Sequence, residues 1–424
     1  MTRHHILILG GGGREHALAW KLAQSDRCDR LSIAPGNGGT REVGTNVDLD
    51  PMDFPAIGDF CLNHGVTMLV VGPEAPLVGG VVDYFMEQPQ LSHILCIGPD
   101  RRGAMLEGSK AFAKEFMEEF DIPTAAYHRF GQDDLSAGID CIRRQPVPIV
   151  LKADGLAAGK GVVICGDHDD AVGEFEAMLS GKFGAASATV VIEQFLDGIE
   201  FSVFALTDGQ HYRLLPVAKD YKRIGEGDTG LNTGGMGSVS PVPFVDDALM
   251  HKVITRIVEP TIKGIRKRDM SYRGFVFFGL INVDGDPYVI EYNCRMGDPE
   301  TQVVIPRIQG DLIALLESLH TGQLAHVPLA EDDRVATAVV SVSGGYPGGY
   351  EKGKAIALPA DTDALLFHAG TKATADGLVT SGGRVLAATA LAGSMKQALA
   401  ISNAATEAIV FDGKYYRRDI GFDL

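Results

Sequence analysis

An apolar strand that ends in alternating polar residues, at positions 289–302 (VIEYNCRMGDPETQ), constrains this chain more than any other segment. Residues two apart in a strand face the same side, so Glu291, Asn293 and Arg295 are expected to share one face. Magnesium takes oxygen ligands from one or two protein groups and completes its shell with phosphate and water. The pattern therefore predicts a site for a metal-bound nucleotide and an anionic substrate. A strand end with a surface salt bridge is the simpler alternative.

Composition narrows the class of protein. The 424 residues predict two to four domains, and 45% hydrophobic with 22% charged residues is typical of a globular enzyme. A formal net charge of -17 argues against nucleic-acid or anionic-membrane partners, which need a basic surface. The six cysteines form no CxxC pair, which favours reduced thiols. We expect a cytoplasmic protein, since no signal peptide or membrane-length apolar run occurs.

The first 103 residues alternate short apolar strands with helices, which is typical of a doubly wound parallel sheet. Strands are expected at 6–9, 31–34, 68–71 and 94–97, and helices at 15–23, 54–64 and 81–86. A loop rich in glycine or proline follows each strand. Ligands bind beyond the carboxyl ends of strands in such sheets, so this edge is a predicted binding rim.

A second unit follows helix 109–120 and a hinge at 122–123. Its expected strands are 149–152, 162–165, 189–195, 200–207, 211–215, 275–283 and 288–292, and its expected helices are 171–179, 248–268 and 312–319. A long glycine-rich loop is expected at 225–237. From about residue 335 the pattern changes to strands at 335–342, 364–369 and 385–389 with one helix at 395–406, which predicts a small α+β domain.

The first glycine loop, Gly10, Gly11, Gly12 and Gly13, follows a strand and opens a helix, so its backbone amides can bind an anion. A dinucleotide fingerprint fails because its third glycine falls on Glu15. The acidic residue for ribose is also replaced by residues 34–37, Ala-Pro-Gly-Asn. A phosphate site for a smaller ligand is favoured, with a tight turn that binds nothing as the alternative.

The second glycine loop, at 152–162, resembles a Walker A loop, but its spacing is short and Gly161 stands where Ser or Thr should bind magnesium. It joins two strands instead of a strand and a helix. We expect a flap that closes over phosphates, with Lys152 holding them from the preceding strand. An ordinary hairpin with a surface lysine is the alternative.

Two further segments carry weaker signals. Residues 193–200 can offer backbone groups to adenine and the Glu200 carboxylate to ribose, although an acidic strand turn fits equally well. The loop at 225–238 permits close approach to a ligand or is a disordered surface loop. No GxSxG, HExxH or Cys/His pairing occurs, so a nucleophile or zinc hydrolase is not supported.

Nine motifs together resemble the phosphoribosylamine–glycine ligase family, also called glycinamide ribonucleotide synthetase, of the ATP-grasp superfamily. They run nearly end to end and are collectively specific. They are GGREHALAWK (12–21), APGN (34–37), VGPEAPLV (71–78), LEGSKAF (106–112), KADGLAAGKGV (152–162), NTGGMG (232–237), EYNCRMGDPETQ (291–302), SGGYPG (343–348) and FHAGT (367–371).

The resemblance implies a fold and a reaction. The fold has a Rossmann-like domain at 1–103, an ATP-grasp domain at 104–328 with a mobile lid near 123–190, and a C-terminal α+β cap at 329–424. ATP would phosphorylate the carboxylate of glycine, and 5-phosphoribosylamine would attack the glycyl phosphate to give glycinamide ribonucleotide, ADP and phosphate for purine biosynthesis. The resemblance further implies Mg²⁺ or Mn²⁺, small-molecule partners only, and a cytoplasmic monomer.

The resemblance also assigns roles to matching residues. ATP would be bound by Lys110, Lys152, Gly159, Lys160, Gly161, Glu193, Phe195, Leu196 and Glu200. Glu291 and Asn293 would hold the metal, and Lys152 and Arg295 would act on the transferring group. The remaining substrate contacts would come from Gly10, Gly11, Gly12, Gly13, Asn37, Pro73, Glu74, Asp220, Asn232, Arg295 and Asp298.

Three positions depart from the family pattern. Tyr221 replaces a histidine and Leu231 replaces a proline, and residues 277–280 supply no metal carboxylate. Tyrosine does not titrate near neutrality, so no acid–base role is expected at Tyr221. The competing hypotheses are an ATP-grasp ligase or carboxylase with another acceptor, an NAD-dependent oxidoreductase, and a catalytically silent ATP-binding protein.

Overall fold

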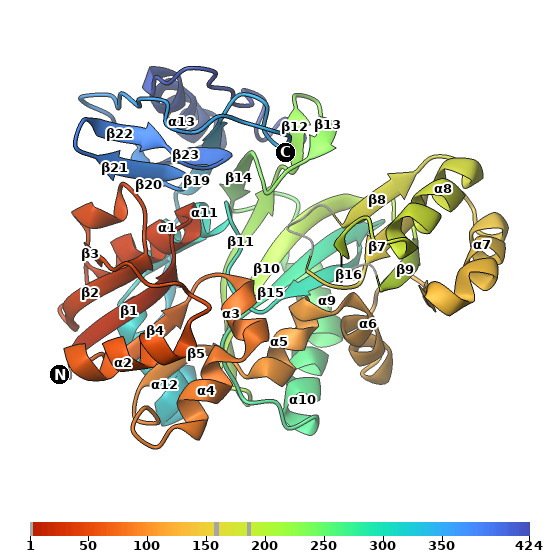
Figure 1. The fold of residues 1–424 in the computed structure, drawn as a ribbon, viewed down its shortest axis with the longest axis horizontal. Helices are drawn as coiled ribbons and strands as arrows, with labels where there is room; N and C mark the ends of the chain where they lie inside the picture. The colour runs from red at the N-terminus through yellow and green to blue at the C-terminus, as the bar shows by residue number, and fades with distance from the viewer. Residues whose placement is uncertain (1–2, 157–160, 185–187) are drawn as a thin grey trace.

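The computed structural model describes residues 3–156, 161–184 and 188–424 (Figure 1). Its first part is the expected parallel sheet, in the strand order β5-β4-β1-β2-β3. The strands are β1 (His4–Gly10), β2 (Cys28–Pro35), β3 (Thr45–Asn46), β4 (Met68–Val71) and β5 (Leu95–Pro99). The helices α1 (Gly13–Leu22), α2 (Phe54–His64) and α4 (Val81–Glu87) confirm the predicted alternation.

A short helix, α3 (Glu74–Gly79), lies between β4 and α4. After β5, helices α5 (Arg101–Gly108) and α6 (Lys110–Glu119) lead into the rest of the molecule. Ser109 caps α6 by accepting a hydrogen bond from the Phe112 amide at 3.1 Å. The sequence did not predict α3 and α5, because six to eight residues are too few for a clear helical period.

The central sheet is antiparallel and is built around one long strand, β15 (Tyr272–Val283). β15 pairs with β10 (Ile199–Thr207) and β16 (Asp286–Asn293), and the sheet continues from β10 through β11 (Tyr212–Asp220) to β14 (Gly237–Ser240). The end of β15 also pairs with β5, through Tyr272 opposite Pro99, so the first and central parts share one continuous sheet. The helix expected at 248–268 is interrupted: α9 (Asp247–Val253) and α10 (Glu259–Lys267) flank a π-helical turn (Ile254–Val258).

A separate four-stranded sheet projects to one side of the molecule (Figure 1). It has the order β6-β9-β7-β8 and consists of β6 (Tyr127–Gly131), β7 (Ile149–Ala153), β8 (Val162–Cys165) and β9 (Thr189–Gln194). Helices α7 (Leu135–Arg144) and α8 (His168–Leu179) pack on it around a small core that includes Phe175. The sequence patterns did not predict β6 and α7. The prediction that the second glycine loop joins two strands is confirmed, and these strands, β7 and β8, pair in the antiparallel direction.

The C-terminal part is the expected small α+β unit, joined to the main sheet where β14 pairs with β19. It contains β19 (Val335–Val342), β20 (Leu365–His368), β21 (Thr371–Thr374), β22 (Gly377–Thr380), β23 (Arg384–Ala392) and α13 (Met395–Ala408). The preceding segment holds α11 (Thr301–Val304), β17 (Ile308–Gln309), α12 (Leu312–Thr321) and β18 (Ala330–Glu331). The loop expected at 225–237 is wrong in part, because β12 (Arg223–Gly225) and β13 (Thr229–Asn232) form a hairpin there.

The two largest hydrophobic clusters lie on opposite faces of the continuous sheet. Leu7 and Leu9 of β1 belong to one cluster, whereas Ile6 and Ile8 belong to the other. This alternation is what a strand covered on both faces requires. No helix in the described ranges is long and apolar enough to cross a membrane. These packed layers cover both faces of the sheet, and several of the predicted site residues lie at the ends of its strands.

Candidate active site

The glycine loop after β1 is folded around one buried carboxylate. Glu15 accepts a hydrogen bond from the Gly12 amide at 2.6 Å and another from Arg14 Nε at 2.6 Å. A Cβ on Gly10, where φ is +115°, would lie 2.6 Å from Glu15 Cγ, and one on Gly72 would lie 2.1 Å from Glu15 Oε1. Both glycines are therefore needed to make room for Glu15. The sequence analysis missed this role, although Glu15 three residues after Gly12 is a capping-box spacing.

Asn37 fixes the same loop to the C-terminal part of the chain. Its amide nitrogen donates to the carbonyl oxygens of Gly11 at 3.0 Å and His368 at 2.7 Å, and its oxygen accepts from the Gly39 and Thr40 amides. The side chain is 6% exposed, and every donor and acceptor of its amide is used. The structure thus places Asn37 as a positioning group at the edge of the glycine loop.

Arg295 lies beyond the last residue of β16, so strand alternation does not determine its direction as the sequence analysis assumed. Its Nη2 donates to Glu107 at 2.5 Å, and its Nε lies 3.4 Å from a Glu74 oxygen, next to Pro73. Burial raises the pKa of Glu107 above its usual value, although Arg295 opposes this. Burial also raises the pKa of Glu74, but Arg295 and Arg14 outweigh it, so that pKa is lowered. The sequence analysis did not single out Glu107.

Lys152 of β7 is buried beside the end of β16. Its Nζ lies 2.9 Å from Glu193 Oε2 and donates to the Ile290 carbonyl at 3.3 Å. Lys114 of α6 lies 3.2 Å from the same Glu193 oxygen. The other oxygen, Glu193 Oε1, is buried and has no hydrogen-bond partner among the residues that the structure describes. Such an atom is costly unless a ligand completes its hydrogen bonding.

The second glycine loop is anchored to α6 by Asp154. This carboxylate accepts from the Ala111 amide at 2.7 Å and from Ser109 Oγ at 2.9 Å. Lys110, the first residue of α6, donates to the Gly155 carbonyl at 3.2 Å. Burial lowers the pKa of Lys110, while Glu291 opposes this. The carbonyl of Gly161 accepts from the Ala153 amide, whereas Gly159 and Lys160 lie outside the described residues.

Glu291 and Asn293, at the end of β16, have uncommitted side chains. Neither makes a side-chain hydrogen bond with any residue in the described ranges, although Asn293 is only 8% exposed. No group of three or more His, Cys, Asp or Glu side chains within those ranges could hold a metal ion. The two free oxygen donors fit a hard cation whose other ligands are phosphate and water.

The segment between β9 and β10 continues the polar surface. Phe195 and Leu196 are half-buried between β9 and β10, and Glu200 is exposed. Lys222 bridges Glu200 at 2.9 Å and Asp220 at 2.8 Å, and it lowers the pKa of Glu200. Tyr221, which departs from the family pattern, donates to Asp423 of the C-terminal tail at 2.7 Å.

Asp298 lies in the loop that follows β16 and contacts the residues of the first glycine loop. Its carboxylate accepts from the Arg14 amide at 3.4 Å and from Gln302 at 2.7 Å, and it lies 3.4 Å from Arg384. Burial raises the pKa of Asp298, but Arg384 and Arg14 outweigh it and lower that pKa. Asn232 is half-buried at the end of β13. Asp298 therefore connects the N-terminal rim with the strand end that carries Glu291.

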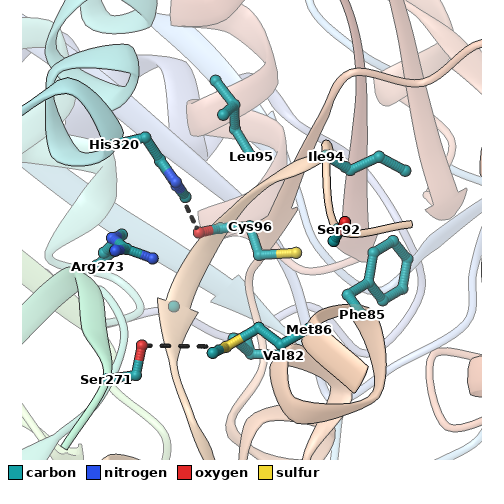
Figure 2. A pocket seen from close by; sticks show the side chains of 11 residues that line it. Val82, Phe85, Met86, Ser92, Ile94, Leu95, Cys96, Ser271, Arg273 and His320 are labelled. Carbon is teal, nitrogen blue, oxygen red and sulfur yellow. Dashed lines mark hydrogen bonds between the residues drawn. The ribbon is translucent and has the colours of Figure 1, made fainter. Parts of the chain in front are cut away.

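A cavity of about 80 Å³ lies away from these groups, between α4, β5 and α12 (Figure 2). Apolar side chains such as Phe85 and Met86 line it, and His320 donates from Nε2 to the Cys96 carbonyl at 3.0 Å. Burial, helped by Arg273, lowers the pKa of His320 to about 4. The cavity contains none of the predicted site residues.

Comparisons with known proteins agree along the whole chain. The N, ATP-grasp and C domain models of phosphoribosylglycinamide synthetase match residues 4–107, 108–301 and 336–423. Phosphoribosylamine–glycine ligases from Chlorobaculum tepidum and Vibrio cholerae are 46% and 43% identical, over 98% of this chain and 99% and 97% of theirs. The crystal structure of the Thermotoga maritima phosphoribosylamine–glycine ligase is 35% identical, with a TM-score of 0.85 over 98% of this chain and 99% of that one.

A more distant structure shares the fold alone. The biotin carboxylase domain of the Hydrogenobacter thermophilus 2-oxoglutarate carboxylase, solved with MgADP, has a TM-score of 0.73 at 15% identity, over 99% of this chain and 93% of that one. With its separate four-stranded unit beside a large mixed sheet, the chain is an ATP-grasp ligase. More particularly, it belongs to the phosphoribosylglycinamide synthetase family, as the sequence motifs indicated.

Proposed function

We propose that this chain joins glycine to 5-phosphoribosylamine at the expense of ATP, giving glycinamide ribonucleotide, ADP and phosphate in purine biosynthesis. A glycine carboxylate oxygen attacks the γ-phosphorus of ATP, and ADP leaves. The amine of phosphoribosylamine then attacks the acyl carbon, loses a proton, and expels phosphate, which carries away that carboxylate oxygen. No enzyme nucleophile takes part, so catalysis depends on positioning and charge neutralisation.

The observation that carries this proposal is the group of unsatisfied atoms between β9 and β16. Lys152 lies beside Ile290, Glu193 has a free buried oxygen, and Glu291 and Asn293 have uncommitted side chains. We assign the adenosine to Glu193, Phe195, Leu196 and Glu200. The phosphates are assigned to Lys110 and Lys152 and to the second glycine loop with Gly159, Lys160 and Gly161.

Glu291 and Asn293 would hold the divalent cation, Mg²⁺ or Mn²⁺. Bound there, the cation neutralises phosphate charge as the γ-phosphoryl group is transferred. Arg295 adds a fixed positive charge, since Glu107 and Glu74 hold its guanidinium in place. Lys152 supplies a second positive charge, which is mobile.

Phosphoribosylamine is assigned to the N-terminal rim, where the first glycine loop, Asn37, and Pro73 with Glu74 surround the end of the parallel sheet. Asp298, Asp220 and Asn232 complete the substrate side. In this proposal the domains are 1–103, 104–328 and 329–424, residues 123–190 act as a lid, and the protein works as a cytoplasmic monomer on small molecules.

ADP release tests the function directly. Purified protein would be supplied with ATP, Mg²⁺, glycine and phosphoribosylamine made in situ from ribose 5-phosphate and ammonia. ADP should appear only when glycine and the amine source are both present. ADP formation that is indifferent to glycine would show that this ATP-grasp site serves another acid.

A further inference from the structure

A second buried lysine, which the site assignments above leave without a role, shares the Glu193 carboxylate with Lys152. Lys114 is 2% exposed and lies 3.2 Å from Glu193 Oε2, while Lys152 lies 2.9 Å from the same oxygen. Two ammonium groups thus face one carboxylate, and the second carboxylate oxygen has no partner in the described ranges. One ammonium group is enough to pair with one carboxylate, so the presence of a second buried lysine needs an explanation.

The two lysines differ in how firmly they are held. Lys114 also donates to Thr124 Oγ1 at 2.8 Å and to the Ala125 carbonyl at 3.2 Å, so all three of its N–H groups have acceptors. Thr124 in turn donates to the Val289 carbonyl at 2.7 Å, which ties this cluster to β16. Among the described residues, Lys152 contacts only the Ile290 carbonyl, at 3.3 Å, apart from Glu193. Lys152 is the lysine that can turn away.

Moving Lys152 to a phosphate would ordinarily be costly. If Lys152 were the only cation beside Glu193, its departure would leave a buried carboxylate unpaired. We propose that Lys114 is a positioning residue that keeps Glu193 paired and thereby releases Lys152 to the phosphates of the nucleotide. This inference rests on the proposed function, because it takes ATP as the ligand that Lys152 meets.

If Lys114 has this role, the effects of replacing Lys114 and Glu193 on ATP affinity should not be additive. In Lys114→Met, Glu193 keeps Lys152 as its only partner and competes with the phosphates for it. Replacing Glu193 by glutamine removes the competing charge, so in the Glu193→Gln background the loss of Lys114 should cost little further ATP affinity, whatever Glu193→Gln itself costs as an adenosine contact. A lysine that merely supported the fold would lower ATP affinity equally in both backgrounds.

The experiment measures the dissociation constant of ATP by calorimetry for the full-length wild type, Lys114→Met, Glu193→Gln and the double variant. Lys114→Met should bind ATP about tenfold more weakly, which is about 1.4 kcal/mol. The double variant should bind within about threefold of Glu193→Gln. Lys182→Met is the matched control: this lysine pairs with Glu174 in the same four-stranded unit but is largely solvent-exposed, so its loss should leave affinity within about twofold.

Two results would overturn the inference: ATP affinity of Lys114→Met equal to that of the wild type, or a double variant that binds ATP about tenfold more weakly than Glu193→Gln. If Lys114→Met does not unfold cooperatively, Lys114→Gln replaces it, because glutamine keeps donors for Thr124 and Ala125 while losing the charge. Wild-type protein that fails to bind ATP would instead contradict the proposed function itself, so the two failures are distinguishable.

Discussion

The first glycine loop and the Lys152–Glu193 cluster are both buried and polar, yet they differ in whether their atoms already have partners. Around the glycine loop, both oxygens of Glu15 and every polar atom of the Asn37 amide are hydrogen-bonded within the protein. In the cluster, Glu193 keeps a buried oxygen with no described partner, and the nearby Glu291 and Asn293 are uncommitted. This difference supports the proposal that the satisfied groups hold the shape of the site, whereas the unsatisfied groups are the ones that bind ligands.

Glu291→Ala should have the largest effect, and it tests most directly the role of the groups that have no hydrogen-bond partner. Loss of a metal ligand should reduce kcat by about 10³-fold or more, or about 4 kcal/mol. The melting temperature should stay near that of the wild type, because Glu291 makes no described hydrogen bond to lose. Steady-state kinetics and thermal unfolding measure the two quantities. Glu176→Ala, at an exposed glutamate of α8, is the control, and an active Glu291→Ala enzyme would refute the metal assignment.

Glu15→Ala should mainly lower stability, in contrast to Glu291→Ala, which should mainly lower kcat. The substitution leaves Arg14 buried without its carboxylate and empties the space beside Gly10 and Gly72, so the free energy of unfolding should fall by about 3 kcal/mol. Denaturant unfolding measures this loss, with Glu87→Ala at an exposed helix end as the control. The proposed difference between the two regions would be contradicted if Glu15→Ala kept full stability and lost ATP binding.

Asn37→Ala separates positioning from substrate contact. It removes the hydrogen bonds that join the glycine loop to Gly39, Thr40 and His368, so stability should fall by about 2 kcal/mol. Asn63→Ala, on the exposed face of α2, should cost far less. A raised KM for phosphoribosylamine at unchanged stability would instead show that Asn37 acts mainly as a direct ligand.

Glu300→Gln should have the smallest effect, visible only as pH dependence. Burial, reinforced by Asp220, raises the pKa of Glu300 from 4.5 to about 8 in the folded protein. Between these values the folded form keeps a proton that the unfolded form has lost, so wild-type stability should fall as pH rises through this window. The variant should lose that part of the slope, so its free energy of unfolding should change less between pH 5 and pH 8.5 than that of the wild type. Equal slopes in denaturant unfolding would contradict the raised pKa.

The sequence predicted most of the fold because apolar strands and the glycine-rich turns between elements are local signals. It placed β4, β8 and β19 at their observed bounds and identified the parallel and α+β parts. It missed β6 and α7, whose outer faces are polar and whose core is small. The hairpin of β12 and β13 was missed because six glycines obscured the pairing.

The candidate site was predictable only where a side chain stands in a recognisable motif. Glu291, Asn293 and Lys152 follow from strand ends, and the family comparisons agree with the motifs that contain them. Glu107 stands inside the LEGSKAF motif and Lys114 just after it, but neither was singled out, since their importance comes from contacts with Arg295 and Glu193, 188 and 79 residues away. Such pairings depend on tertiary packing, which no local pattern encodes.

Oxygen transfer from glycine is the most direct test of the proposed reaction. Glycine labelled with ¹⁸O in both carboxylate oxygens would be used with ATP and phosphoribosylamine, and the phosphate product analysed by mass spectrometry. Attack of the carboxylate on the γ-phosphorus predicts one ¹⁸O in each phosphate and one retained in the amide. Phosphate that forms together with ADP but carries no ¹⁸O would mean that water takes the phosphoryl group, and the ligase assignment of this site would be contradicted.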